Sequence, residues 1–360
     1  MAGLDDRQIA RWRLVSQRLA GRPAGAPDDV VRGLLGVQAE NFSQAGWAVA
    51  ARSTPISWPQ FTAAFDDGDI LRIHVLRTTW HFVTPDDLIW LVELTAPALR
   101  RLYVQSRRAY GIDDRTLDAA IAVIVDGIAA DGPQTREQLR PRLQDAGLPA
   151  AGPALTTITA SAEAMALICS GPLAGAEQTH ALVRERAPRA RRLDRDEALA
   201  EIAQRYFTGH GPATDRDLAY WATLTITDVR RGLAAVGDRL ARFEHDGRTF
   251  WHAIDSDPPA MTGSAHLLQI LDEMYRGYQD SRWVLDAAQL VGRERETSTG
   301  IALLDGQIGA AMTRRIAPKE VVFDLAPFRA LDARERAALD VVAARYGQFL
   351  GRVGRVVIDD

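Results

Sequence analysis

The sequence predicts an α+β protein in which three tandem winged-helix units precede a small C-terminal β-barrel or curled sheet. Three observations lead to this fold class. Groups of amphipathic helices are each followed by a pair of short β-rich segments, which is the pattern of a winged helix-turn-helix. Two helix entries resemble one another, which indicates an internal repeat. After about residue 260, short alternating runs separated by turns replace the helical pattern.

The first winged-helix unit is expected over residues 1–108. Asp5 and Asp6 are typical of a helix N-terminus, and Gly21 ends the apolar stripe that follows them. β-branched and aromatic residues after residue 69 predict two short strands. The expected helices are 5–20, 28–37, 58–65 and 85–101, and the expected strands are 70–76 and 80–83.

The second and third units are expected over residues 109–192 and 193–260. Each contains Gly-Pro-x-Thr before a short helix, and a threonine there can accept a hydrogen bond from the free N–H groups of the first turn. Asp246-Gly247 predicts a two-residue β-hairpin in the third unit. The expected helices are 115–130, 135–146, 155–166, 196–208, 215–221 and 227–236, and the expected strands are 167–169, 179–183, 240–245 and 248–252.

The C-terminal domain is expected over residues 261–360. Asp305-Gly306 is another hairpin signal, and the flanking runs alternate apolar and polar residues. The expected strands are 287–290, 301–304, 307–312, 320–325 and 352–358, with one helix over 330–350.

Composition limits the classes of protein that the chain can belong to. A hydrophobic content of 47% over 360 residues is enough for a real core, and a formal charge of −4 excludes a nucleic-acid binder that acts by bulk positive charge. Lys319 is the only lysine among 43 basic residues, so arginine supplies the bidentate donors suited to phosphates. Cys169 is the only cysteine, which excludes an intramolecular disulfide and a cysteine-based zinc cluster.

No apolar run reaches the roughly 20 residues of a membrane span, so we expect a cytoplasmic protein, associated with the nucleoid when it is bound to DNA.

Two polar groups in the first unit indicate a functional site. Gln38, Glu40 and Asn41 follow an apolar helix, where amphipathic packing does not require them. About thirty residues later, five polar or basic residues alternate along a strand with Ile73 and Val75, so that one face could meet phosphates or the lesion. These are Arg72, His74, Arg77, Thr79 and His81, and a structural role is favoured for His74. The alternative is a structural role for both groups, as caps for helix carbonyls and as an exposed strand face with a buried histidine.

Several short motifs occur in an order that resembles the AlkZ-like (YcaQ/AlkX) family of bacterial winged-helix DNA-binding proteins. The resemblance covers nearly the whole chain. The motifs are Leu35-Gly36-Val37-Gln38-Ala39, Leu76-Arg77-Thr78-Thr79-Trp80-His81, Gln178-Thr179-His180, the Gly211–Asp217 segment, and the stretch from His266 through Asp272-Glu273 to Arg282.

The resemblance implies a DNA glycosylase that needs no metal and no cofactor. Characterised members of the family cleave the N-glycosidic bond of bulky N7-alkylpurines, and some unhook interstrand crosslinks. Their catalytic motif is Gln–apolar–Gln, or Gln–apolar–Asp in one branch, and Gln38-Ala39-Glu40 occupies that position here. We therefore expect Gln38 to orient a water and Glu40 to polarise it or to stabilise the sugar cation. Residues i and i+2 do not share a helix face, so this requires the helix to end near Gln38.

Residues near the start of the C-terminal domain are expected to contribute to structure and to DNA binding. A buried ionic and hydrogen-bonded cluster could join this domain to the first unit through Asp272, Glu273, Tyr278 and Arg282. The alternative is a DNA-facing rim. A structural role is favoured for Asp272, whereas Arg276 and Arg282 are assigned to DNA phosphates together with Asn41 and the strand residues. The expected partner is alkylated double-stranded DNA, bound by a monomer. Two alternatives stay open: a winged-helix protein that binds DNA or sequesters a drug without catalysis, motivated by glutamate at position 40, and a transcriptional regulator, for which no dimerisation helix is evident.

Overall fold

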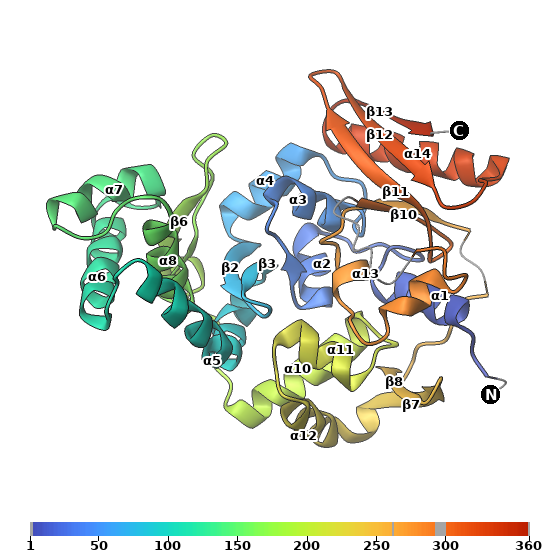
Figure 1. The fold of residues 1–360 in the computed structure, drawn as a ribbon, viewed down its shortest axis with the longest axis horizontal. Helices are drawn as coiled ribbons and strands as arrows, with labels where there is room; N and C mark the ends of the chain where they lie inside the picture. Colours follow the sequence, from blue (N-terminus) through green and yellow to red (C-terminus); the bar gives the residue numbers. More distant parts are fainter. Residues whose placement is uncertain (1–2, 261–262, 292–299, 359–360) are drawn as a thin grey trace. The chain divides into compact units, whose positions relative to one another are not determined.

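The computed structural model describes residues 3–260, 263–291 and 300–358, and its elements fall into two compact units (Figure 1). One unit combines Met1–Phe61 with Ala200–Asp360, and we call it the outer-segment unit. The other, Thr62–Leu199, is the middle unit. In the described parts of the chain, no helix is both long and apolar enough to cross a membrane.

The middle unit begins with an antiparallel hairpin in which β2 (Leu71–Val75) pairs with β3 (Thr79–Val83). The long helix α5 (Pro85–Ala109) packs against β2. A small sheet follows in the order β4-β6-β5, surrounded by helices. Its remaining elements are α6 (Asp114–Asp131), β4 (Gln134–Thr135), α7 (Arg136–Asp145), α8 (Gly152–Glu163), β5 (Ile168–Ser170), β6 (Thr179–Leu182) and α9 (Val183–Arg186).

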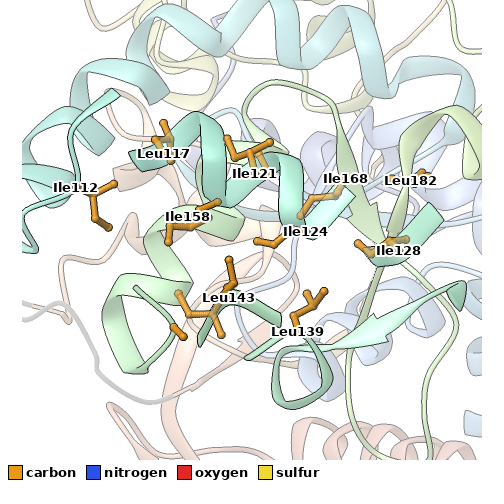
Figure 2. Packing of buried hydrophobic residues seen from close by; sticks show 14 residues of the cluster. Ile112, Leu117, Ile121, Ile124, Ile128, Leu139, Leu143, Ile158, Ile168 and Leu182 are labelled. Carbon is orange, nitrogen blue, oxygen red and sulfur yellow. The ribbon is translucent and has the colours of Figure 1, made fainter. Parts of the chain in front are cut away.

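A cluster of aliphatic side chains holds the second half of the middle unit together (Figure 2). Ile124 of α6 is fully buried with Leu139 and Leu143 of α7 and Ile158 of α8. Each fully buried aliphatic side chain contributes about 1.5–3 kcal/mol relative to exposure. The apolar stripes that predicted these three helices therefore meet in one core.

The outer-segment unit contains the N-terminal helices, a second helical group and the C-terminal sheet (Figure 1). Its hairpin, β7 (Leu240–His245) with β8 (Arg248–Ala253), turns at Asp246-Gly247 as the sequence predicted. Its helices and short strand are α1 (Asp6–Ser16), α2 (Pro27–Leu34), β1 (Val37–Gln38), α3 (Phe42–Ala50), α11 (Asp215–Ala222), α12 (Ile226–Val236), the 3₁₀ turn η1 (Gly237–Arg239) and α13 (Glu273–Arg276). Helices α4 (Trp58–Asp67) and α10 (Arg195–Gly209) carry the chain from one unit to the other.

The C-terminal sheet has five strands in the order β13-β12-β11-β10-β9. The last pair is parallel, and a parallel pair needs a crossover connection, which α14 (Ala333–Phe349) provides while it packs against β13. In the described residues β9 and β13 remain edges, so the sheet is open. Of the two expected forms, the structure has the curled sheet and not a closed barrel. The strands are β9 (Ala265–Leu268), β10 (Gly300–Leu304), β11 (Gln307–Ile316), β12 (Glu320–Pro327) and β13 (Val353–Ile358).

Two further expectations were wrong, and one helix was not predicted. The helix expected over 28–37 ends at Leu34, because Leu35 adopts a left-handed φ of 65° although the apolar pattern continues. Helix α3 was not expected, although Asn41 is a typical N-cap. The strand expected at 287–290 is a turn after the 3₁₀ helix η2 (Arg282–Asp286), in which the Asp286 carboxylate accepts from the backbone N–H groups of Leu290 and Val291.

Candidate active site

Gln38 lies on β1, beyond the end of α2, in a short extended segment. The expected roles of Gln38 and Glu40 require a helix end near Gln38, and α2 ends at Leu34, four residues before it. The side chain is mostly buried, and the backbone N–H donates to Glu273 Oε1 over 2.9 Å. The peptide of Gln38 is therefore fixed by a side chain that lies 235 positions away in the chain.

Glu40 and Asn41 follow at the surface, where the chain enters α3. Asn41 is the N-cap: its side-chain oxygen accepts from the Gln44 backbone N–H at 3.1 Å and from the Ser43 hydroxyl at 3.0 Å. The alternative in which Asn41 caps carbonyls at the end of the preceding helix is therefore wrong. The carboxylate of Glu40 precedes a helix N-terminus, where the helix dipole favours negative charge.

The carboxylate that holds Gln38 is itself fully buried. Glu273 Oε2 accepts a hydrogen bond of 2.7 Å from the indole N–H of Trp221 and lies 3.4 Å from His210 Nε2. Neither aromatic side chain is exposed to solvent. Burying a charged group is costly unless its oxygens are hydrogen-bonded, and both oxygens of Glu273 are.

A network of further polar side chains surrounds this carboxylate. Asp272 forms a bidentate ion pair with Arg52, at 2.7 and 2.9 Å, and neither side chain reaches solvent. Gln17 donates to the Glu273 carbonyl and to the Tyr278 hydroxyl, and burial raises the pKa of Tyr278 well above its usual range. The buried cluster that the sequence predicted from Asp272, Glu273 and Tyr278 is therefore present.

Arg276 and Arg282 are partly exposed at the edge of this cluster. The guanidinium of Arg282 lies 4.6 Å from the centre of the Tyr275 ring, and its Nε donates to the Tyr278 carbonyl at 2.9 Å. Arg282, Tyr275 and Trp283 line a groove of about 840 Å³ in the outer-segment unit. Both arginines lie at a surface, and Arg282 is held there by its contacts with two tyrosines.

The predicted strand residues belong to the middle unit, and part of their polar face is buried. Arg72 and His74 are less than a tenth exposed, and both lie on the ring of Trp80, at 4.1 and 4.2 Å. His74 Nδ1 lies 2.5 Å from the carboxylate of Glu163 on α8. The expectation of an exposed polar strand face therefore does not hold for β2.

Glu163 is a buried carboxylate that faces two histidines. Burial by itself would raise the pKa of Glu163, but the charge and hydrogen bonds of His74, with a contribution from His180, lower it to about 2. Burial lowers the pKa of His180 to about 4 in spite of the attraction of Glu163, whose Oε1 lies 3.6 Å from His180 Nδ1. His180 belongs to the Gln178-Thr179-His180 motif, whereas Glu163 was not predicted from the sequence. The signal was present, because Glu163 is the one carboxylate in the otherwise uncharged helix 152–163.

The other predicted residues lie in the turn of the same hairpin, at Arg77, and on β3, at Thr79 and His81. Arg77 and Thr79 are partly exposed, whereas His81 is fully buried. Arg77 Nη2 lies 3.3 Å from His81 Nε2, and His81 Nδ1 lies 2.9 Å from the Thr79 carbonyl oxygen. The hairpin thus brings these three residues together. In the described residues, no group of three or more histidine, cysteine, aspartate or glutamate side chains is arranged to hold a metal ion.

Comparisons with known proteins agree on one family. The family model described as "DNA glycosylase AlkZ-like" matches residues 31–349, a range that contains every predicted site residue. An interstrand DNA cross-link repair glycosylase of Streptomyces sahachiroi is 27% identical over 255 residues, which is 67% of this chain and 68% of the relative. The solved structure of the Streptomyces sahachiroi DNA glycosylase AlkZ matches 99% of this chain and 100% of its own length, with a TM-score of 0.74 and 21% identity. At that identity the structural match shows the shared α+β fold.

Proposed function

The chain belongs to the family of AlkZ-like DNA glycosylases, and from this premise we propose that it excises bulky N7-alkylated purines from duplex DNA. The reaction is hydrolysis of the N-glycosidic bond, without a metal or a cofactor. Unhooking of interstrand crosslinks belongs to the same proposal, because the curated relative is a cross-link repair glycosylase.

The observation that carries the proposal is the local structure of Gln38-Ala39-Glu40. The Gln38 peptide is fixed by a buried carboxylate, Ala39 is buried, and Glu40 reaches the surface at the start of α3. Catalytic groups must be held in a productive geometry and must reach the substrate. The extended backbone at Gln38 also removes the helical geometry in which residues two apart point in different directions.

Cleavage of the N-glycosidic bond of an N7-alkylated purine needs little help from a general acid. Alkylation at N7 gives the purine a positive charge, so the base leaves as a neutral molecule when the bond between C1′ and N9 breaks. The deoxyribose then carries positive charge at C1′, and a water adds there and loses its proton. We assign orientation of that water to the Gln38 amide, and stabilisation of the sugar cation and acceptance of the proton to the Glu40 carboxylate.

The three winged-helix units remain part of the proposal, with bounds 1–108, 109–192 and 193–260. The order of elements supports them, because helix, short strand or bridge, two helices and two strands occur three times along the chain. The third round begins with α10 and has an isolated bridge, Ala213 to Trp251, in place of the first strand. Residues 261–360 then form the fourth domain, which contains the sheet.

The proposed DNA contacts are the partly exposed polar residues. Arg276, Arg282, Arg77 and Thr79 are assigned to phosphates, and Asn41 is assigned to the strand near the reacting sugar. Arg72 and His81 are buried, so we assign them the role of supporting the hairpin that presents Arg77. Phosphate contacts give affinity without reading sequence, which suits an enzyme that searches for lesions as a monomer.

Release of an N7-alkylguanine from duplex DNA by the purified protein tests the proposal, with Glu40→Gln measured beside it. Release by the natural protein supports the glycosylase. Tight DNA binding without release by either protein would favour the non-catalytic DNA-binding alternative. A stable dimer that binds palindromic DNA would favour a regulator instead.

A further inference from the structure

We propose that Glu273 is a positioning residue for the glycosylase reaction: its buried carboxylate holds the peptide of Gln38 and so sets the direction of the Gln38-Ala39-Glu40 segment. This inference rests on the proposed function, in which Gln38 and Glu40 act on the lesion. It assigns a role to a residue that the motif itself does not contain.

The two oxygens of the Glu273 carboxylate accept from different donors. Each oxygen has its own donor: Oε1 accepts from the Gln38 backbone N–H at 2.9 Å, and Oε2 accepts from the Trp221 indole N–H at 2.7 Å. A carboxylate offers two acceptor oxygens, whereas an amide of the same shape offers one. A glutamine at position 273 could therefore not satisfy both donors.

The surroundings leave Glu273 little freedom to move. Its own carbonyl accepts from Gln17 Nε2 at 3.2 Å and from the Gly277 backbone N–H at 2.8 Å. His210, which faces Oε2, stacks on the ring of Tyr206 with centroids 4.7 Å apart. Residue 273 is thus held at its backbone carbonyl, and His210 faces its Oε2 atom. The Gln38 N–H therefore donates to a rigid group.

The hydrogen bond from Gln38 to Glu273 anchors the catalytic segment, so its loss should affect the rate of base release more than the affinity for DNA. Gln38 is the last residue of β1, and the chain turns from there through buried Ala39 to exposed Glu40. Loss of the hydrogen bond frees the peptide from which both catalytic side chains are directed. A misplacement of about 1 Å in a catalytic group can cost roughly 100-fold in rate.

Two variants and their combination test the idea in single-turnover base release, normalised to the folded fraction of each protein. Glu273→Gln leaves two donors competing for one oxygen, and we expect the rate to fall about 10- to 100-fold while the Kd for duplex DNA changes less than about threefold. Trp221→Phe removes the competing donor. The double variant is therefore expected to release base faster than Glu273→Gln alone, a non-additive result that general destabilisation does not produce.

Asp217→Asn is the matched control. Asp217 is also a fully buried carboxylate that holds the same segment, since it accepts from the backbone N–H groups of Gln279 and Ser281 at 2.9 and 3.1 Å. The Asp217→Asn variant should be less stable but keeps every contact of Gln38. Its rate of base release per folded molecule should therefore stay near that of the natural protein. An equal loss of rate in Asp217→Asn and Glu273→Gln, or no recovery in the double variant, overturns the inference.

Hydrogen exchange of the Gln38 amide gives a readout that does not depend on activity. The amide should be protected in the natural protein and exchange faster in Glu273→Gln, while the amides of Gln279 and Ser281 keep their protection. Equal exchange of the Gln38 amide in both proteins overturns the anchor. Absence of base release by the natural protein, with this difference in exchange intact, refutes the proposed function and leaves the anchor in place.

Discussion

Arg52 and Asp272, 220 positions apart in the chain, form a buried ion pair in which two guanidinium nitrogens reach the two carboxylate oxygens at 2.9 and 2.7 Å. Arg52 follows α3, and Asp272 precedes Glu273. The pair therefore ties the helix that starts beside Glu40 to the segment that holds Gln38. Two long-range interactions, this pair and the hydrogen bond from Gln38 to Glu273, converge on adjacent residues of one short segment.

Replacing Asp272 should strongly destabilise the fold. Asp272→Asn leaves the Arg52 guanidinium buried without a countercharge, and breaking a buried pair from one side costs about 3–5 kcal/mol. The free energy of unfolding in urea measures this loss. Asp324→Asn, which breaks the exposed pair with Arg315, should leave the urea midpoint almost unchanged. Similar losses in both variants would contradict a special role for the buried pair.

Removing the proposed catalytic groups should separate chemistry from binding. Gln38→Ala and Glu40→Ala are each expected to lower the rate of base release by about 10²–10⁴-fold, the range for lost general acid–base assistance. The Kd for duplex DNA should stay nearly constant, because neither side chain is assigned to phosphates. Single-turnover kinetics and fluorescence anisotropy measure the two quantities. Full activity in both variants would show that the motif is not the catalytic site.

Burial of His180 in the middle unit should make stability depend on pH. The pKa of His180 lies at about 4 in the folded protein, below its usual 6.5, so the unfolded chain binds more protons between these values. Stability should therefore fall as pH drops from about 6.5 to 4. The shift corresponds to about 3 kcal/mol. Unfolding curves from pH 7 to pH 4 should show a smaller loss in His180→Asn than in the natural protein.

The carboxylate of Glu163 should also make stability fall as pH drops, but over a lower pH range than His180. Its pKa is lowered from 4.5 to about 2, so its contribution is complete above pH 4.5 and is lost as pH falls towards 2. Glu163→Gln should be less stable than the natural protein at pH 6, and the difference should shrink below pH 4. Parallel stability curves for the two proteins from pH 6 to pH 3 would rule out this assignment.

A methyl group at Gly277 should disturb the anchor of Gln38. An added Cβ would lie 2.4 Å from the Glu273 carbonyl oxygen and 2.9 Å from His210 Cδ2. Overpacking of this kind costs about 1–3 kcal/mol, so Gly277→Ala should lower the thermal midpoint. Gly33→Ala is the control, because its Cβ meets nothing closer than 3.6 Å, at the Arg18 side chain. An unchanged midpoint for Gly277→Ala would mean that the segment can shift freely.

Contact with DNA phosphates should appear in the salt dependence of binding. Replacement of Arg276 by glutamine should weaken binding to all duplex sequences and reduce the slope of log K against log salt by about 1. Arg329→Gln, which removes an arginine paired with Glu335, should leave the slope unchanged. Equal slopes for Arg276→Gln and the natural protein would remove Arg276 from the interface.

Most of the secondary structure could be read from the sequence because its signals are local. The β7–β8 hairpin follows from Asp246-Gly247 between two β-rich runs, and the stripes of α6 and α8 follow from helical periodicity. Prediction failed where the apolar pattern did not follow the backbone. The stripe of α2 continues through Leu35 and Val37, and both are buried, but the left-handed conformation of Leu35 ends the helix.

The sequence by itself determined the local elements, the position of the Gln38-Ala39-Glu40 motif and the resemblance to one family. Tertiary structure alone decided which side chains surround that motif. Glu273 holds Gln38 across 235 residues, and Glu163 meets His74 across 89. The same packing buried Arg72 and His74, which a strand pattern alone would place at the surface. The physical reason is that burial and pairing of polar groups depend on how distant elements pack, and a local pattern records only which residues could form each element.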